Sequence, residues 1–287
     1  MRIALLGTGL LGGAMAERLL DLRNRLTVYN RTREKTLLLE NKGARVVSSA
    51  SEAVAGVDCV ILMLSDASAI AEVLLDEACA THLAGKIVLQ MGTIAPAESV
   101  NLAQSVEGFG GGYAEAPVLG SVSEAKSGKL IVMFGGSDEL FARSRGVLSA
   151  FAGELVRVGC IGKAAAVKLA LNQLIAALTA GFSLSLGLIE KEGIDVERFM
   201  EILRGSALYA PTFDKKLHRM VERDFSRPNF PTKHLAKDVA LFLKEADRLG
   251  LDDSALRGIH RILDKAIASG AGEEDYSALH NTISPSR

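Results

Sequence analysis

The chain has 287 residues, of which 48% are hydrophobic and 23% are charged, and its formal net charge is -1. This composition is ordinary for a soluble globular protein, and the length allows two domains. The near-neutral charge, without a basic stripe, argues against nucleic acid as a partner.

The three cysteines are Cys59, Cys79 and Cys160. Their odd number and uneven spacing fit neither a disulfide framework nor a metal site. We therefore expect no bound metal, and a reducing cytoplasm is the natural compartment for such a chain.

The longest apolar segment covers residues 164–189 and carries Lys168 and Asn172 near its start. Both side chains are costly in lipid, so we interpret the segment as a buried helix and expect no membrane association. The apolar residues 1–6 run directly into a glycine motif and lack a cleavage site, so no signal peptide is expected.

The first half of the chain alternates short apolar strands with helices. Strands are predicted over residues 2–7, 26–30, 44–47, 58–64, 86–90, 112–116, 130–135 and 155–158. Helices are predicted over residues 10–22, 34–42, 67–82 and 138–151. Helices placed between buried strands are typical of a parallel, doubly wound sheet.

After Gly162 the strand patterns stop. Residues 163–191 predict one long helix that is apolar, and hence buried, nearly all round. Asp195 is a plausible N-cap for the next helix. That helix carries Val196, Phe199, Ile202 and Leu203 on one face.

Two further apolar stripes predict helices over residues 233–249, with Leu249 on the stripe, and 255–267. The second half is therefore expected to be a helical bundle. We expect an α/β domain over residues 1–162, followed by an all-α domain over residues 163–287 that is built around the long central helix.

A glycine motif stands between the first predicted strand and the first predicted helix. Gly7, Gly9 and Gly12 form the pattern G-x-G-x-x-G, which in this context indicates a dinucleotide-binding Rossmann domain. The first glycine permits a tight turn, the second admits the pyrophosphate, and the third lets the helix pack on the strand. A glycine turn without a ligand is the alternative. The cofactor is expected to contact Gly7, Thr8, Gly9, Leu10, Leu11 and Gly12.

The end of the second strand indicates which dinucleotide binds. An NAD site usually has Asp or Glu there, on the ribose hydroxyls. This chain has Asn30, Arg31 and Thr32 instead. Arginine attracts the 2′-phosphate of NADP and can bind two of its oxygens at once, and the threonine hydroxyl adds a donor. We therefore expect NADP(H), unless Arg31 is only a solvated charge at a helix start.

Lys168 and Asn172 are four residues apart and share one face of the long helix. Both interrupt an apolar helix, and burying an ammonium without a partner or purpose is expensive. A low dielectric lowers the pKa of a lysine and suits it to proton transfer. The residues alone leave two interpretations equally open: a proton donor with an orienting amide, or a lysine that extends to solvent from the end of a buried helix.

Four motifs occur in order along the chain. They are residues 7–12, the segment Glu115-Ala-Pro-Val-Leu-Gly-Ser121, the helix with Lys168 and Asn172, and the segment Phe230-Pro-Thr-Lys-His-Leu-Ala-Lys237-Asp238. Together they resemble the β-hydroxyacid dehydrogenase family, which includes 3-hydroxyisobutyrate dehydrogenase, and most closely its glyoxylate/succinic semialdehyde reductase branch. The resemblance covers essentially the whole chain. It implies NADPH-dependent reduction of a small carbonyl acid to a hydroxy acid, by a homodimer or homotetramer.

The resemblance also implies roles for residues that would hold the substrate. Lys168 would be the general acid that protonates the carbonyl oxygen, and Asn172 would hold the same substrate. Ser121, with the backbone around Gly120, would bind the substrate carboxylate. Leu119 stands where the family usually has serine, which removes one hydroxyl donor near that carboxylate.

Further roles concern the cofactor. The resemblance places Thr93 beside the nicotinamide and brings the backbone of Leu64 to the cofactor. Lys237 would reach the cofactor from the helical domain, and Phe230 and Asp238 would line the substrate cleft.

Three alternatives stay open. The first is an NAD-dependent dehydrogenase of the 3-hydroxyisobutyrate type that works in the oxidative direction. The second is an imine reductase, although imine reductases usually lack the lysine that this chain has at Lys168. The third is a non-catalytic NADP-binding module that recognises a protein or chromatin partner, and such modules typically have lost the lysine as well.

Overall fold

A computed structural model describes residues 1–285 of the chain. The chain forms two compact units, Met1–Lys168 and a second unit that begins at Leu169. The long helix α9 (Lys163–Lys191) begins in the first unit and continues into the second.

The first unit is built on one nine-stranded sheet. Its strands are β1 (Arg2–Leu6), β2 (Arg25–Tyr29), β3 (Arg45–Val46), β4 (Cys59–Leu62), β5 (Ile87–Gln90), β6 (Gly112–Glu115), β7 (Val118–Leu119), β8 (Leu130–Gly135) and β9 (Ala152–Gly159). The spatial order is β3-β2-β1-β4-β5-β6-β8-β7, with β9 paired to β8. The pairings from β3 to β6 are parallel, whereas β8 runs antiparallel to β6 and β7. The mostly parallel, doubly wound sheet is therefore confirmed.

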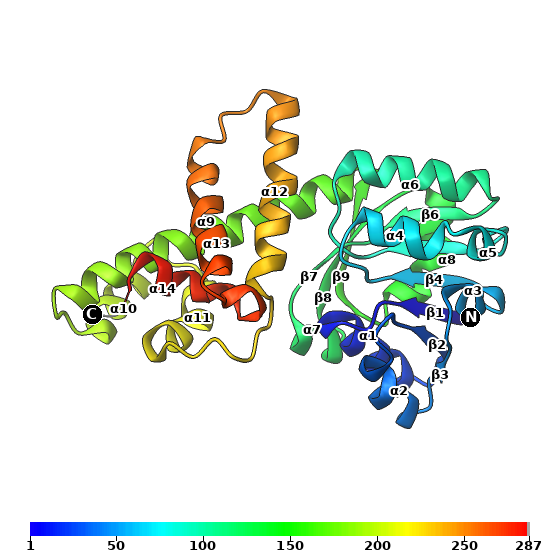
Figure 1. Ribbon diagram of the computed structural model, residues 1–287, viewed down its shortest axis with the longest axis horizontal. Helices are drawn as coiled ribbons and strands as arrows, with labels where there is room; N and C mark the ends of the chain where they lie inside the picture. The colour runs from blue at the N-terminus through cyan, green and yellow to red at the C-terminus, as the bar shows by residue number, and fades with distance from the viewer. Residues whose placement is uncertain (286–287) are drawn as a thin grey trace. The chain divides into compact units, whose positions relative to one another are not determined.

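Helices cover both faces of this sheet (Figure 1). They are α1 (Leu10–Asp21), the 3-10 turn η1 (Arg33–Thr36), α2 (Leu37–Asn41), α3 (Ala50–Ala55), α4 (Ala67–Leu74), α5 (Glu77–Ala80), α6 (Pro96–Gly108), α7 (Val122–Ser127) and α8 (Asp138–Leu148). Successive side chains of a strand point to opposite faces of the sheet, so β1 contributes residues to two hydrophobic cores. Ile3 and Leu5 pack with α1, α7 and α8, whereas Ala4 and Leu6 pack with α3, α4, α5 and α6.

Some of the predicted helix boundaries were wrong. The single helix expected over residues 67–82 is divided into α4 and α5, because Asp76 accepts a hydrogen bond from the Ala78 N–H and starts a new helix. Helices α3, α6 and α7 were not predicted. All three carry recognisable start signals, namely Ser-x-x-Glu at the starts of α3 and α7 and Pro96 at the first position of α6.

The second unit is entirely helical, which confirms the all-α domain around a long central helix. After α9 come α10 (Val196–Arg204), α11 (Pro211–Glu222), α12 (Thr232–Leu249), α13 (Ser254–Ala268), the 3-10 turns η2 (Ala271–Glu273) and η3 (Tyr276–Ala278), and α14 (Leu279–Ile283). Ala176 of α9 packs in one core with α12 and α13, and Phe182 and Leu186 pack in another with α10 and α11. Asp195 caps α10 as predicted, since it accepts a hydrogen bond of 2.8 Å from the Arg198 N–H.

The expectation that α9 is buried nearly all round was wrong. Leu184 and Leu188 are 67% and 61% exposed, because the helices of this chain cover one side of α9 only. Ile202 and Leu249, which spacing placed on apolar faces, are exposed as well. Within residues 1–285, α9 is the one helix long and apolar enough to cross a membrane, a test that core helices of soluble proteins also pass. The exposed leucines are compatible with the expected homo-oligomer, which stays a prediction.

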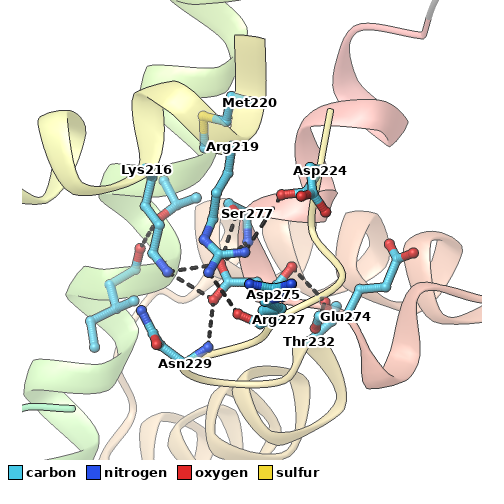
Figure 2. A network of polar contacts seen from close by, with 12 residues as sticks. Lys216, Arg219, Met220, Asp224, Arg227, Asn229, Thr232, Glu274, Asp275 and Ser277 are labelled. Carbon is cyan, nitrogen blue, oxygen red and sulfur yellow. Dashed lines mark hydrogen bonds and ion pairs between the residues drawn. The ribbon is translucent and has the colours of Figure 1, made fainter. Parts of the chain in front are cut away.

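A buried ion pair joins three segments of the second unit (Figure 2). The Lys216 ammonium of α11 lies 2.8 and 2.9 Å from the two carboxylate oxygens of Asp275, which is fully buried. The Ser277 hydroxyl and the Asn229 N–H donate to the same carboxylate at 2.7 and 3.1 Å. The ammonium also lies 4.2 Å from the ring centroid of Tyr276. Helix α11, the loop before α12 and η3 are therefore tied together.

Burial by itself favours the protonated acid, but the Lys216 ammonium and the Ser277 hydroxyl hold the pKa of Asp275 below its ordinary value. A carboxyl group whose pKa is lowered by folding stabilises the folded state at pH values above its ordinary pKa. This stabilisation is lost as the pH falls through the lowered pKa.

We predict that Asp275→Asn lowers the free energy of unfolding at pH 7 by about 3 to 5 kcal/mol, because the Lys216 charge stays buried without its counter-ion. Urea titrations measure this. As the pH falls below 3.8, the ordinary pKa of aspartate, the wild type should lose more stability than the variant. The control is Glu139→Gln, which breaks the exposed pair with Arg143 and should change the stability by at most about 0.5 kcal/mol. Equal stability of the two variants would show that the buried pair contributes nothing.

Candidate active site

The predicted cofactor residues of the first unit gather at one edge of the sheet. Gly7 follows β1, Asn30 follows β2, Leu64 follows β4 and Thr93 follows β5, and these four strands are neighbours. The carboxyl ends of parallel strands meet at the same edge, which is where open α/β sheets bind ligands. The backbone of Leu64 is also close to Gly92, because a Cβ added to Gly92 would lie 2.7 Å from the Leu64 carbonyl oxygen.

The three glycines meet the demands of a dinucleotide loop. Gly7 has φ +99°, and a Cβ there would lie 2.3 Å from the Met63 carbonyl oxygen. A Cβ on Gly12 would lie 2.1 Å from the Gly7 carbonyl oxygen, so only glycine lets α1 pack this closely. At Gly9, the N-cap of α1, a Cβ would meet no atom of the described chain within 4 Å. This open space at the start of a long helix fits a pyrophosphate.

The Asn30 side chain links the glycine loop to the residues after β2. Its side-chain oxygen accepts a hydrogen bond of 2.9 Å from the Thr8 N–H, and its side-chain nitrogen donates one of 2.9 Å to the Thr32 carbonyl. The Thr8 hydroxyl oxygen is buried and has no hydrogen-bond partner among residues 1–285, so it can bind an oxygen of a ligand. Arg31 and Thr32 are exposed just after β2, where a 2′-phosphate can reach them.

Ser121 is the N-cap of α7, and the carboxylate of Glu124 engages it closely. The Ser121 N–H donates to Glu124 Oε2 at 2.9 Å, and the Ser121 hydroxyl makes a very short hydrogen bond to the same oxygen. The hydroxyl is the main reason that the pKa of Glu124 falls to about 2. Gly120, with φ +133°, is exposed beside it. Ser121 can bind a substrate carboxylate only if Glu124 releases the hydroxyl, so this role stays a prediction.

Lys168 lies on α9, in the first unit, and is half-buried. The first turn of α9 is held by Glu115, whose buried carboxylate accepts hydrogen bonds from the Gly162 and Ala164 N–H groups at 2.8 and 3.0 Å. The sequence analysis used Glu115 only as a mark of family resemblance and missed this contact. No local sequence pattern predicts this contact, because the N–H groups that donate to Glu115 lie 47 or more residues further along the chain. The partner of Ser121 was also missed, although the spacing Ser-x-x-Glu was a usable signal.

In the second unit, Asn172 and Asp238 form a buried pair. The Asn172 side-chain nitrogen donates to Asp238 Oδ2 at 2.6 Å, and the Lys237 ammonium lies 2.9 Å from Asp238 Oδ1. A carboxylate only accepts hydrogen bonds, so it determines which way the amide points. The Asn172 oxygen is buried without a hydrogen-bond partner in the described part of the chain. Asn172 therefore offers a ligand an acceptor.

Phe230, in the loop before α12, packs among aromatic rings. It stacks on the His234 ring at 6.4 Å between centroids and meets the Tyr276 ring edge-on at 5.9 Å. Burial, with the nearby Lys233 and Lys237 charges, lowers the pKa of His234, so its imidazole is neutral at pH 7. Phe230 therefore packs against two other rings, from α12 and η3.

Two family profiles match the chain. One, described as the NAD binding domain of 6-phosphogluconate dehydrogenase, matches residues 2–162, and the other, described as NAD-binding of NADP-dependent 3-hydroxyisobutyrate dehydrogenase, matches residues 162–283. Glyoxylate/succinic semialdehyde reductase 1 of Arabidopsis thaliana is 30% identical over 100% of both chains. The chain belongs to the 3-hydroxyisobutyrate dehydrogenase-related family. It is accordingly an NAD(P)-dependent hydroxyacid dehydrogenase that acts on CH–OH groups.

Other members of this family are similar over their full lengths. The 2-hydroxy-3-oxopropionate reductase of Escherichia coli (strain K12) is 30% identical over 97% of this chain and 96% of its own. A crystal structure of 3-hydroxyisobutyrate dehydrogenase from Salmonella typhimurium superposes with a TM-score of 0.89 at 23% identity, covering 98% of this chain and 99% of that one. The dehydrogenase therefore shares the fold of that protein.

We predict opposite effects for alanine at two adjacent glycines of α1. Gly12→Ala should lower the melting temperature and abolish dinucleotide binding, because the added methyl collides with the Gly7 carbonyl. Gly13→Ala should keep binding and add about 0.5 to 1 kcal/mol of stability, since its Cβ would meet only the Thr8 carbonyl oxygen at 3.7 Å. Calorimetry and nucleotide fluorescence titration measure both effects. Unimpaired binding by Gly12→Ala would contradict the close packing.

Proposed function

We propose that this dehydrogenase uses NADPH to reduce a small carbonyl acid, such as glyoxylate or succinic semialdehyde, to the hydroxy acid. The observation that carries the proposal is Lys168, a half-buried ammonium on α9, four residues before the buried Asn172. The name of the Arabidopsis relative, which includes both glyoxylate and succinic semialdehyde, supports this substrate class.

The cofactor would lie along the carboxyl edge of the sheet. The glycine loop from Gly7 to Gly12, the Thr8 hydroxyl, Leu64 and Thr93 are the residues of the first unit that would hold it. Lys237 would contribute from the second unit. NADPH, when bound, supplies the hydride.

The chain itself supplies a proton and the means to orient the substrate. The Lys168 ammonium donates its proton to the carbonyl oxygen, so that the negative charge developing there is neutralised. Asn172 presents its oxygen, because Asp238 holds the nitrogen. That oxygen accepts a hydrogen bond from the hydroxyl of the product hydroxy acid. The carboxylate would be bound by donors, namely the backbone at Gly120 and, once Glu124 releases it, the Ser121 hydroxyl. Phe230 provides an apolar wall that excludes water.

We predict that Lys168→Ala lowers kcat about a hundredfold or more and leaves NADPH binding largely intact, because only the proton donor is removed. The matched control is Lys163→Ala, which removes an exposed lysine from the same helix and should leave kcat unchanged. Both variants are assayed with NADPH and each of glyoxylate, succinic semialdehyde, tartronate semialdehyde and methylmalonate semialdehyde. A Lys168→Ala enzyme with near-normal kcat on the best of these substrates excludes Lys168 as the general acid.

The preference for NADPH over NADH rests on Arg31. An exposed guanidinium just after β2 attracts a 2′-phosphate, whereas an aspartate repels it and instead accepts hydrogen bonds from ribose hydroxyls.

We therefore predict that Arg31→Asp shifts the ratio of kcat/KM for NADPH to that for NADH by about tenfold or more towards NADH. Arg145→Asp, the same charge change on an exposed residue of α8, should leave the ratio unchanged. Initial rates with both cofactors decide this. If the two variants have the same ratio, the 2′-phosphate is not bound by Arg31.

A further inference from the structure

Glu115 is a buried acid at the end of β6 that the mechanism above does not use. It is 1% exposed. Its Oε1 accepts a hydrogen bond of 2.8 Å from the Gly162 N–H, and its Oε2 accepts two, of 3.0 Å from the Ala164 N–H and 3.4 Å from the Ala165 N–H. The first N–H groups of a helix have no partner within the helix, and a negative charge there is favourable. One carboxylate therefore binds the first turn of α9.

The carboxylate is held by a rigid part of the sheet. Strand β6 lies between β5 and β8, and Glu115 is in register with Gln90 and Gly135. The next residue, Ala116, also donates its N–H to the Gln90 carbonyl at 2.8 Å. A side chain on such a strand has little freedom to follow a displaced helix, so the helix must follow the strand.

The space around the carboxylate is closed by a glycine. A Cβ added to Gly135 would lie 2.5 Å from Glu115 Oε2 and 3.2 Å from the Ala164 Cβ. Strand β8, strand β6 and the first turn of α9 therefore meet at one point, and no side chain fits there beyond that of Glu115.

Lys168 follows Ala164 by four residues, which is about one helical turn. Both residues belong to the first unit, together with Glu115. A shift or rotation of the first turn of α9 is therefore passed directly to the Lys168 ammonium. Misplacement of a reacting group by about 1 Å can cost about a hundredfold in rate.

We propose that Glu115 is a positioning residue for the reaction: by binding the first turn of α9 to the central sheet, it sets where the Lys168 ammonium stands. The proposal rests on the proposed role of Lys168 as the general acid. It adds a residue that touches neither substrate nor cofactor, and it assigns Gly135 the task of leaving room for the carboxylate.

The test compares two helix-capping glutamates. Glu115→Gln keeps the size of the side chain but turns an NH₂ group towards at least one of the three N–H donors. Glu98→Gln is the control, because Glu98 is a half-buried glutamate at the start of α6 that accepts one hydrogen bond of 2.8 Å, from the Ala95 N–H, and α6 does not carry Lys168. For both variants we would measure the melting temperature, the Kd for NADPH, and kcat with the best substrate of the panel.

We expect both variants to keep the Kd for NADPH within about twofold, and Glu115→Gln to lose more stability than Glu98→Gln because its side chain accepts three buried hydrogen bonds rather than one. Only Glu115→Gln should lower kcat, by about tenfold to a hundredfold. In a Lys168→Ala background, Glu115→Gln should cause no further loss of kcat, because a residue that acts through Lys168 has nothing left to position. A purely structural role predicts equal kcat for the two glutamine variants, or losses that add in the double variant, and either result overturns the proposal.

A second variant decides the question if Glu115→Gln does not fold. Gly135→Ala keeps the charge and crowds the same carboxylate, so it should lower kcat with the Kd for NADPH unchanged, and an unchanged kcat would overturn the proposal. Failure of the proposed function is distinguishable, since it appears as absence of turnover by the wild type or as normal turnover by Lys168→Ala. Failure of the positioning proposal appears only among the Glu115 and Gly135 variants.

Discussion

Helix α1 packs so closely on the turn after β1 that no side chain fits between them, and the rest of the first unit follows from this contact. A Cβ on Gly12 would be 2.1 Å from the Gly7 carbonyl oxygen, so the helix start lies directly above the strand end. The N–H groups at that start then point to the carboxyl edge of the sheet, where Gly9 leaves open space. Because neighbouring strands are parallel, their loops bring Asn30, Leu64 and Thr93 to the same edge.

The apolar sequence of α9 is interrupted by polar residues because the helix contacts acidic side chains of other elements. It begins against the sheet, where Glu115 binds its first turn, and continues into the second unit, where Asp238 binds Asn172. Asp238 thus orients the amide of Asn172, and Glu115 binds the helical turn that precedes Lys168. An amide in an apolar environment without Asp238 would have two possible orientations, and the buried carboxylate selects one of them.

The helical unit uses a second buried charge for a structural purpose. The Lys216–Asp275 pair does not lie among the residues assigned to the reaction, yet it ties α11 and η3 to the loop that carries Phe230. Figure 2 shows Lys216, Asn229 and Ser277 around this carboxylate. The buried Phe225 and this polar contact together hold the loop.

The sequence by itself determined much of the local structure: most of the sheet strands, the glycine loop after β1, and α9 from Lys163 to Lys191. These follow from residue spacing and from glycine stereochemistry, which act over a few neighbouring positions. Tertiary structure decided what Asn172 and Glu115 bind. The partners of Asn172 and Glu115 lie 66 and 47 or more residues away, and the side of α9 that stays exposed at Leu184 depends on which helices pack there. No pattern within one segment encodes such contacts, because they form only when distant segments meet.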